Sequence, residues 1–167
     1  MKSISILISF TLFLSSCTIE DKSQEIAGLQ AGDALPEFSI SNSQGENVSN
    51  FSCIGKVSLI IFINTECSDC IENFTLIQKI YDKFRDNQNC LFAVIARGET
   101  EEKARTCCKN FTFPIFGDKN ADIYNLFAMS GIPRFYLVGK RGYISSVQVK
   151  NINEDRLIRN ITYLLNK

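Results

Sequence analysis

Two cysteines separated by two residues follow directly on an apolar run, and side chains of this type at this spacing can exchange thiol and disulfide. They are Cys67 and Cys70, in the stretch "NTECSDCIENF" at residues 64–74. A cysteine thiolate attacks a disulfide, and a second thiol close behind it can release the product by closing a disulfide with the first. The same spacing also occurs in metal sites and in pairs of buried structural thiols. All three interpretations stand at this point.

The remaining composition excludes several kinds of chemistry. The chain has 167 residues, zero net charge and no histidine, so neither a Ser-His-Asp triad nor a Cys-His pair nor a histidine metal ligand can form. No basic excess points to a nucleic-acid partner. The other cysteines are Cys17, Cys53, Cys90, Cys107 and Cys108. We interpret the last four as core or incidental thiols, because cysteine is among the most buried residue types; a second disulfide or a redox relay through Cys107 remains open.

The N-terminal segment is typical of an export signal. An apolar run, "ISILISFTLFL", follows Met1 and Lys2 and ends in "LSSC" at residues 14–17. This pattern resembles a bacterial lipobox, and the apolar run is too short to span a bilayer. We predict a lipoprotein signal peptide at 1–16, a lipidated Cys17, a polar tether at 17–28 and one domain at 29–167. The protein would then be lipid-anchored in the bacterial cell envelope, extracytoplasmic and facing the periplasm. An ordinary secretory signal with a chance cysteine is the alternative.

Hydrophobic periodicity predicts the elements that position the cysteine pair. Residues 57–63, "VSLIIFI", are typical of a strand buried on both faces of a sheet. A helix follows from near Cys67 to Phe84, where apolar residues recur at three- and four-residue steps. The other predicted elements are a hairpin around Gly45, strands at 91–96, 113–118, 133–139 and 143–149, and helices at 99–110, at 119–131 and after Asn153. This order predicts an α/β protein with three layers.

Several of these stretches resemble the thioredoxin fold, and within it the membrane-anchored thiol-disulfide oxidoreductases of the TlpA-like, redoxin (AhpC/TSA-related) branch. "AGDALPEFSI" is similar to the opening Gly-x-x-x-Pro-x-Phe strand of that branch. "GKVSLIIFINTECSDC" is similar to its buried strand and Cys-x-x-Cys, and "GIPRFYLVGKRGYI" to its closing run. The resemblance covers about residues 29–166. It implies a thioredoxin-like three-layer sandwich, whose central mixed sheet has helices on both faces and an extra N-terminal hairpin.

The resemblance also implies roles for the site residues. Cys67 would be the attacking nucleophile at a helix N-terminus, where the partial positive charge favours a thiolate, and Cys70 the resolving thiol. Pro133 would be cis and face this pair, and the Ile132 backbone would pair with an extended substrate segment. We therefore expect a lipid-anchored oxidoreductase that acts on protein disulfides or dithiols and receives electrons from an unidentified donor. We expect no cofactor and no metal.

The chain departs from the family pattern beside the cysteines. Glu66 stands where the family often has tryptophan, and Ser68 and Asp69 fill the gap where a proline is common. Acidic side chains oppose the helix dipole and disfavour a thiolate. Our hypothesis is that the pair acts as a reductant or a mild exchanger.

Two other functions remain as alternatives. A peroxiredoxin-like peroxide reductase would resemble the chain at "GDALPEFSI", but peroxiredoxins have a threonine three residues before the reactive cysteine, where this chain has Asn64. A non-catalytic thioredoxin-fold binding module would need no reactive pair. A metal site at Cys67, Cys70, Cys107 and Cys108 is disfavoured, because adjacent cysteines rarely ligate one tetrahedral ion without strain. The charged stretch "ETEEKAR", at residues 99–105, is interpreted as a solvated helix face.

Overall fold

A mixed five-stranded sheet is the centre of the structure, a computed structural model that describes residues 27–167. The strands lie in the order β5-β4-β3-β6-β7. Their bounds are Val57–Ile63 for β3, Cys90–Arg97 for β4, Ile115–Asp118 for β5, Arg134–Val138 for β6 and Ile144–Val149 for β7. β3, β4 and β5 are parallel, while β6 and β7 are antiparallel to their neighbours. The predicted signal peptide and Cys17 lie outside the described residues.

The central strand, β3, leads directly to the predicted site. All seven of its residues are buried, as expected for a β-branched run covered on both faces. The last residue of β3, Ile63, pairs with Ala96 of β4, and Phe62 pairs with Arg134 at the start of β6. The segment after β3 and the segment before β6 therefore meet at one edge of the sheet.

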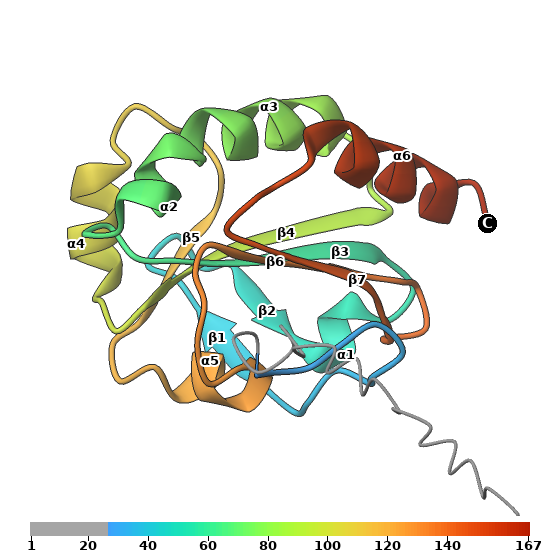
Figure 1. Cartoon of the computed structure of the whole chain (residues 1–167), viewed down its shortest axis with the longest axis horizontal. Coiled ribbons are helices and arrows are strands. Elements are labelled where there is room, and N and C mark those ends of the chain that lie inside the picture. The colour runs from blue at the N-terminus through green and yellow to red at the C-terminus, as the bar shows by residue number, and fades with distance from the viewer. Residues whose placement is uncertain (1–26) are drawn as a thin grey trace, which may run out of the picture.

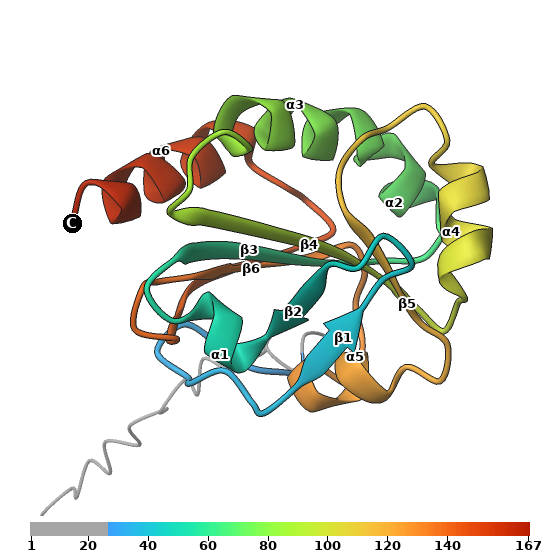
Figure 2. The ribbon, with the colours of Figure 1, turned by 180° about the vertical axis from the view of Figure 1, so that it is seen from behind.

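Helices cover both faces of the sheet and form the outer layers (Figures 1 and 2). On one face lie α2 (Ser68–Glu72), α3 (Phe74–Phe84) and α6 (Glu154–Leu165). On the other lie α1 (Asn50–Cys53), α5 (Asp122–Phe127) and the two-stranded hairpin of β1 (Ser39–Ser41) and β2 (Asn47–Ser49). The remaining helix, α4 (Glu101–Cys107), lies beside α2 at the end of the sheet. The predicted three-layer sandwich with an N-terminal hairpin is confirmed.

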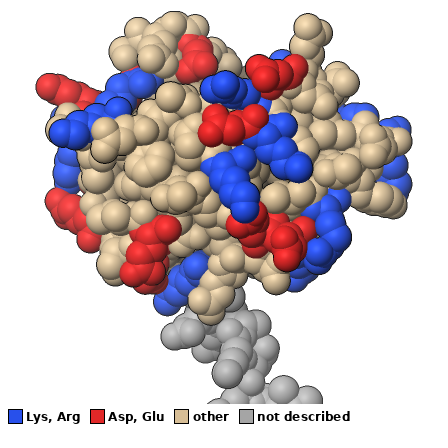
Figure 3. Space-filling model, turned by 90° about the horizontal axis from the view of Figure 1, so that it is seen from above, with Lys and Arg blue, Asp and Glu red and all other residues tan. Residues whose placement is uncertain are grey.

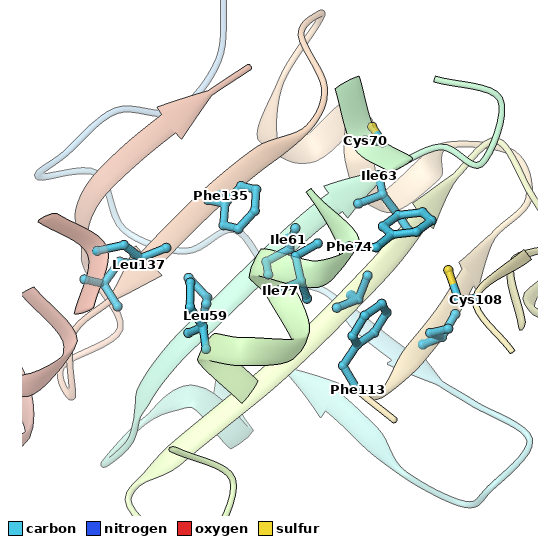
Figure 4. Close-up of a cluster of buried hydrophobic side chains, with 14 of the residues drawn as sticks. Leu59, Ile61, Ile63, Cys70, Phe74, Ile77, Cys108, Phe113, Phe135 and Leu137 are labelled. Atoms are coloured by element: carbon cyan, nitrogen blue, oxygen red, sulfur yellow. The ribbon is translucent and has the colours of Figure 1, made fainter. Parts of the chain in front are cut away.

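Two hydrophobic clusters lie on opposite faces of the sheet, because successive strand side chains point to opposite sides. Leu59, Ile61 and Ile63 belong to the cluster under α3 and α6, which also holds Cys70 (Figure 4). Phe62 belongs to the opposite cluster, where its ring centroid lies 5.1 Å from that of Phe127. Within residues 27–167 no helix is both long enough and apolar enough to cross a bilayer.

Most predicted elements are present, and the differences have local causes. The predicted helix at 99–110 begins only after Thr100, whose side chain accepts a hydrogen bond from the Lys103 N–H and caps the helix. The predicted helix at 119–131 is shorter and spans Asp122–Phe127. The helix after Cys67 is divided at Asn73 into α2 and α3. Helix α1 was not predicted, although Ser49 and Ser52 form a reciprocal capping box at its start.

Candidate active site

Cys67 is the N-cap residue of α2, immediately after the turn that leaves β3. Its N–H donates to the Asn64 carbonyl at 3.2 Å, and its own carbonyl accepts from the N–H groups of Cys70 and Ile71, each at 3.1 Å. Its side chain is half-buried and makes no capping hydrogen bond. The first N–H groups of a helix have no partner within the helix, so donors are available to a group bound at this end of α2.

Cys70 lies one turn behind Cys67 and is fully buried. Burial raises the pKa of the Cys70 thiol well above its usual range, the hydrogen bond and charge of Cys67 and the charge of Asp69 raise it further, and a hydrogen bond from the Asn64 backbone opposes these effects. The two thiols are within hydrogen-bonding reach of each other. The pair therefore has one accessible member and one member that is protonated and shielded.

The segment before β6 lies next to this pair. The Ile132–Pro133 peptide bond is cis, as the resemblance implied. Because Arg134 pairs with Phe62, Pro133 comes level with Ile63, at the point where the chain turns toward Cys67. Ile132 is half-buried and packs against both hydrophobic clusters, whereas Pro133 is buried.

A buried arginine that sequence reasoning missed holds the loop before Pro133. Arg134 has no exposed surface, and its guanidinium donates to the carbonyls of Ser130 at 2.7 Å and Gly131 at 3.3 Å and to the Tyr136 hydroxyl at 3.0 Å. A buried guanidinium needs acceptors, and these two carbonyls and one hydroxyl provide them while the arginine joins the loop to β6. No local sequence signal distinguishes Arg134 from an ordinary strand-entry residue.

A buried carboxylate, also missed, ties the turn before Cys67 to the start of α4. Glu99 is 3 % exposed and accepts from the Thr65 N–H at 2.9 Å and the Thr65 hydroxyl at 2.7 Å. Lys103 lies 2.9 Å from the same carboxylate. Burial acts to raise the pKa of Glu99, but the hydrogen bonds from Lys103 and Thr65 outweigh it and hold that pKa below its usual range.

The electrostatics beside Cys67 differ from the expectation drawn from the acidic residues that flank the pair in the sequence. Glu66 is not an uncompensated acid, because Lys103 lies 2.6 Å from it and 2.9 Å from Glu99. Both carboxylates raise the pKa of Lys103, with Glu66 the larger cause. The interpretation of residues 99–105 as a solvated helix face was therefore wrong for Glu99, which is buried, whereas Lys103 is exposed. Their i, i+4 spacing, with glutamate first, was the available signal.

The other cysteines do not join the pair. Cys53 and Cys108 are buried, Cys90 is half-buried and Cys107 is exposed, and all are free thiols. Burial raises the pKa of Cys90 to about 11 and, together with the adjacent Cys107, that of Cys108 to about 12. Among residues 27–167, no three histidine, cysteine, aspartate or glutamate side chains gather in a way that could hold a metal ion.

The chain is similar to known proteins over this whole domain. Residues 31–147 match the AhpC/TSA family. Thioredoxin-like protein YneN of Bacillus subtilis is 27% identical over 141 residues, covering 81% of each chain. Thiol-disulfide oxidoreductase ResA of Bacillus thuringiensis is 23% identical over 139 residues, covering 82% of this chain and 76% of that protein. The solution structure of a candidate protein disulfide isomerase from Bacteroides thetaiotaomicron superposes with a TM-score of 0.78 at 29% identity, covering 84% of this chain and 94% of that one.

Proposed function

The chain belongs to the AhpC/TSA family and is a thioredoxin-like thiol-disulfide oxidoreductase, and from that premise we propose that it is lipid-anchored and exchanges electrons with protein disulfides through Cys67 and Cys70. One observation carries the proposal: a half-buried thiol caps α2, and a fully buried thiol lies one turn behind it within hydrogen-bonding reach. This asymmetry separates the attacking thiol from the resolving thiol.

The exchange proceeds in two steps, and each step conserves atoms and electrons. The Cys67 thiolate attacks one sulfur of the client disulfide, forming a Cys67–client bond and releasing the other client sulfur as a thiolate, which takes up a proton. The Cys70 thiol then loses its proton and attacks the Cys67 sulfur. A Cys67–Cys70 disulfide forms, the second client sulfur leaves as a thiol, and the client has gained two electrons and two protons. Burial of Cys70 delays its deprotonation until the mixed disulfide is in place.

The client segment is proposed to lie along the backbone of Ile132, next to Pro133. The register of β6 against β3 supports this position, since it brings Pro133 level with the end of β3. Arg134 supports it as well, because its hydrogen bonds to the carbonyls of Ser130 and Gly131 hold the loop in one conformation. A fixed backbone edge loses little entropy when an extended segment pairs with it.

The lipid anchor is proposed at Cys17, within the "LSSC" stretch of the export signal. Two or three acyl chains bind a bilayer firmly, since each buried methylene contributes about 0.8 kcal/mol. Labelling cells with a radioactive fatty acid tests this part alone. Label in the wild type and its loss in Cys17→Ser are expected, and an unlabelled wild type would refute the anchor without affecting the redox proposal.

Insulin reduction with dithiothreitol as the donor tests the redox step. Cys67→Ser should abolish turnover, and Cys70→Ser should retain attack but accumulate a mixed disulfide between Cys67 and the client, visible on a non-reducing gel. Cys107→Ser is the matched control, because Cys107 is exposed but lies outside the pair. Equal turnover by Cys67→Ser and wild type would leave a binding module as the better interpretation. If the protein reduces hydrogen peroxide faster than it reduces insulin, a peroxide reductase is the better interpretation.

The direction of electron flow follows from the redox potential. Because Lys103 offsets the charge of Glu66, the remaining acid in the first turn of α2 is Asp69. Our hypothesis remains a reducing or mildly exchanging pair. Equilibration with glutathione measures the potential, and a value as oxidising as about −120 mV would contradict the hypothesis.

A further inference from the structure

Exposed apolar side chains gather at the end of the molecule away from the redox pair. Phe51 is 73% exposed, Ile54 56% and Tyr143 54%. Two contacts place Ile54 and the end of α1 beside the turn that precedes Tyr143. The Gly55 N–H donates to the Lys140 carbonyl at 2.8 Å, and a Cβ added at Gly142 would lie 2.7 Å from the Ile54 side chain. The turn after α1 therefore packs directly against the β6–β7 turn.

Basic side chains stand among these apolar ones. Lys140, Arg141 and Lys167 line a groove of about 420 Å³ with Tyr143, between the β6–β7 turn and the end of α6. Lys140 also donates to the Leu165 carbonyl at 3.1 Å, which joins the two elements. None of the three cations forms an ion pair with a carboxylate within residues 27–167.

The surface view (Figure 3) also shows basic side chains at the C-terminal tip of the molecule. In Figure 3 the right-hand tip, where the C-terminus lies in Figure 1, shows blue and tan atoms but no red ones. One acid, Asp33, adjoins the start of β7: its backbone carbonyl accepts from the Ile144 N–H, and its carboxylate accepts from the Gln30 N–H. We call the set Phe51, Ile54, Lys140, Arg141, Tyr143 and Lys167 the basic–apolar surface.

The basic–apolar surface and the redox pair lie at opposite ends of β3. The strand begins two residues after Gly55 and ends four residues before Cys67. A strand rises by about 3.3 Å per residue, so the six steps between its seven residues separate the two ends by about 20 Å. A flat partner bound to this surface would leave Cys67 facing away from it.

We propose that the basic–apolar surface docks on an anionic lipid bilayer and directs the redox pair away from the membrane. This inference rests on the proposed function, because the anchor at Cys17 would hold the domain beside the bilayer. Cations attract the headgroups of acidic lipids, and exposed aromatic and aliphatic side chains insert at the interface. A second copy of the chain is a poorer occupant, since a two-fold contact would place the unpaired cations of both copies against each other.

The orientation can be measured with tryptophan, which the chain lacks. The full lipidated chain is reconstituted in phosphatidylcholine vesicles containing phosphatidylglycerol, with bromine on the acyl chains as a quencher. Tyr143→Trp should be quenched several-fold more strongly than Ile71→Trp, whose side chain is 47% exposed and lies in α2 beside the redox pair at the other end. Equal quenching of the two variants would overturn the proposal.

The charge requirement is measured on the chain from residue 17 with Cys17→Ser, which carries no lipid. The double variant Arg141→Gln and Lys167→Gln should bind the same vesicles about 30-fold more weakly. Each basic residue near an anionic membrane contributes about 1 kcal/mol of binding free energy, and the variant loses two of them. The control, Lys109→Gln with Lys119→Gln, removes the same charge from exposed positions elsewhere and should bind like the parent.

Two results would overturn the docking proposal in this second experiment. One is equal binding by both double variants, and the other is a dimer that buries Tyr143 in the absence of vesicles. An unlabelled wild type in the fatty-acid experiment would refute only the anchor, because this chain is assayed without lipid.

Discussion

Replacing Glu99 by glutamine is expected to lower the free energy of unfolding in a pH-dependent way. The substitution keeps the shape of the side chain, but an amide nitrogen cannot accept the Thr65 hydrogen bond that a carboxylate oxygen accepts. A hydrogen bond to a buried charged group contributes about 1.5–3 kcal/mol. The Lys103 pair adds about 0–1 kcal/mol, because the Lys103 side chain is 48% exposed. We expect a total loss of about 1.5–4 kcal/mol near neutral pH.

The pH dependence follows from the direction of the shift. The folded state lowers the pKa of Glu99, so the unfolded chain binds its proton more tightly. The stabilisation is therefore complete above the unfolded value, about 4.3, and is lost as the pH falls through the lower folded pKa. At low pH the protonated Glu99 of the wild type resembles glutamine, and the two proteins should approach each other in stability.

Urea denaturation of the reduced proteins, followed by circular dichroism at several pH values, measures this difference. The control is Glu102→Gln, an exposed position in the neighbouring helix α4, which should change stability by less than about 0.5 kcal/mol. A loss below about 1 kcal/mol near neutral pH, or an equal loss under acidic conditions, would refute the role assigned to the buried carboxylate.

Three further outcomes are expected. In the folded, reduced protein iodoacetamide should modify Cys67 and spare Cys70, because burial raises the pKa of Cys70; equal rates in a peptide mass spectrum would contradict the assignment. Gly117→Ala should cost about 1–3 kcal/mol of unfolding free energy, because the new Cβ would lie 2.2 Å from a backbone nitrogen of α4, whereas Gly139→Ala has a nearest contact of 3.8 Å and should be neutral. Arg134→Met removes the three hydrogen bonds that join the loop before Pro133 to β6, so it should lower the melting temperature and raise KM for insulin; an unchanged KM would show that the loop does not need this arginine.

The elements that carry the site were predictable because their signals are local. Residues 57–63 are a β-branched run without polar interruption, and that run is β3. Asn153 accepts a hydrogen bond from the Arg156 N–H and begins α6, as the pattern after it predicted. Pro133 was expected to be cis only through the family resemblance, and it is. The boundaries of α4 and α5 were less accurate, because the pattern of charges and apolar residues continues beyond the last helical turn.

The sequence by itself determined the order of elements and the place of Cys67 and Cys70 at a strand-to-helix junction, since periodicity and spacing are properties of neighbouring residues. Only the tertiary structure decided which charges meet around that junction. Glu99 lies 34 residues from Thr65 along the chain, and Lys103 lies 37 residues from Glu66. These contacts exist because β3 and β4 pair in parallel and end at the same edge of the sheet. Electrostatic interaction depends on distance in space, which a linear pattern of residues does not contain.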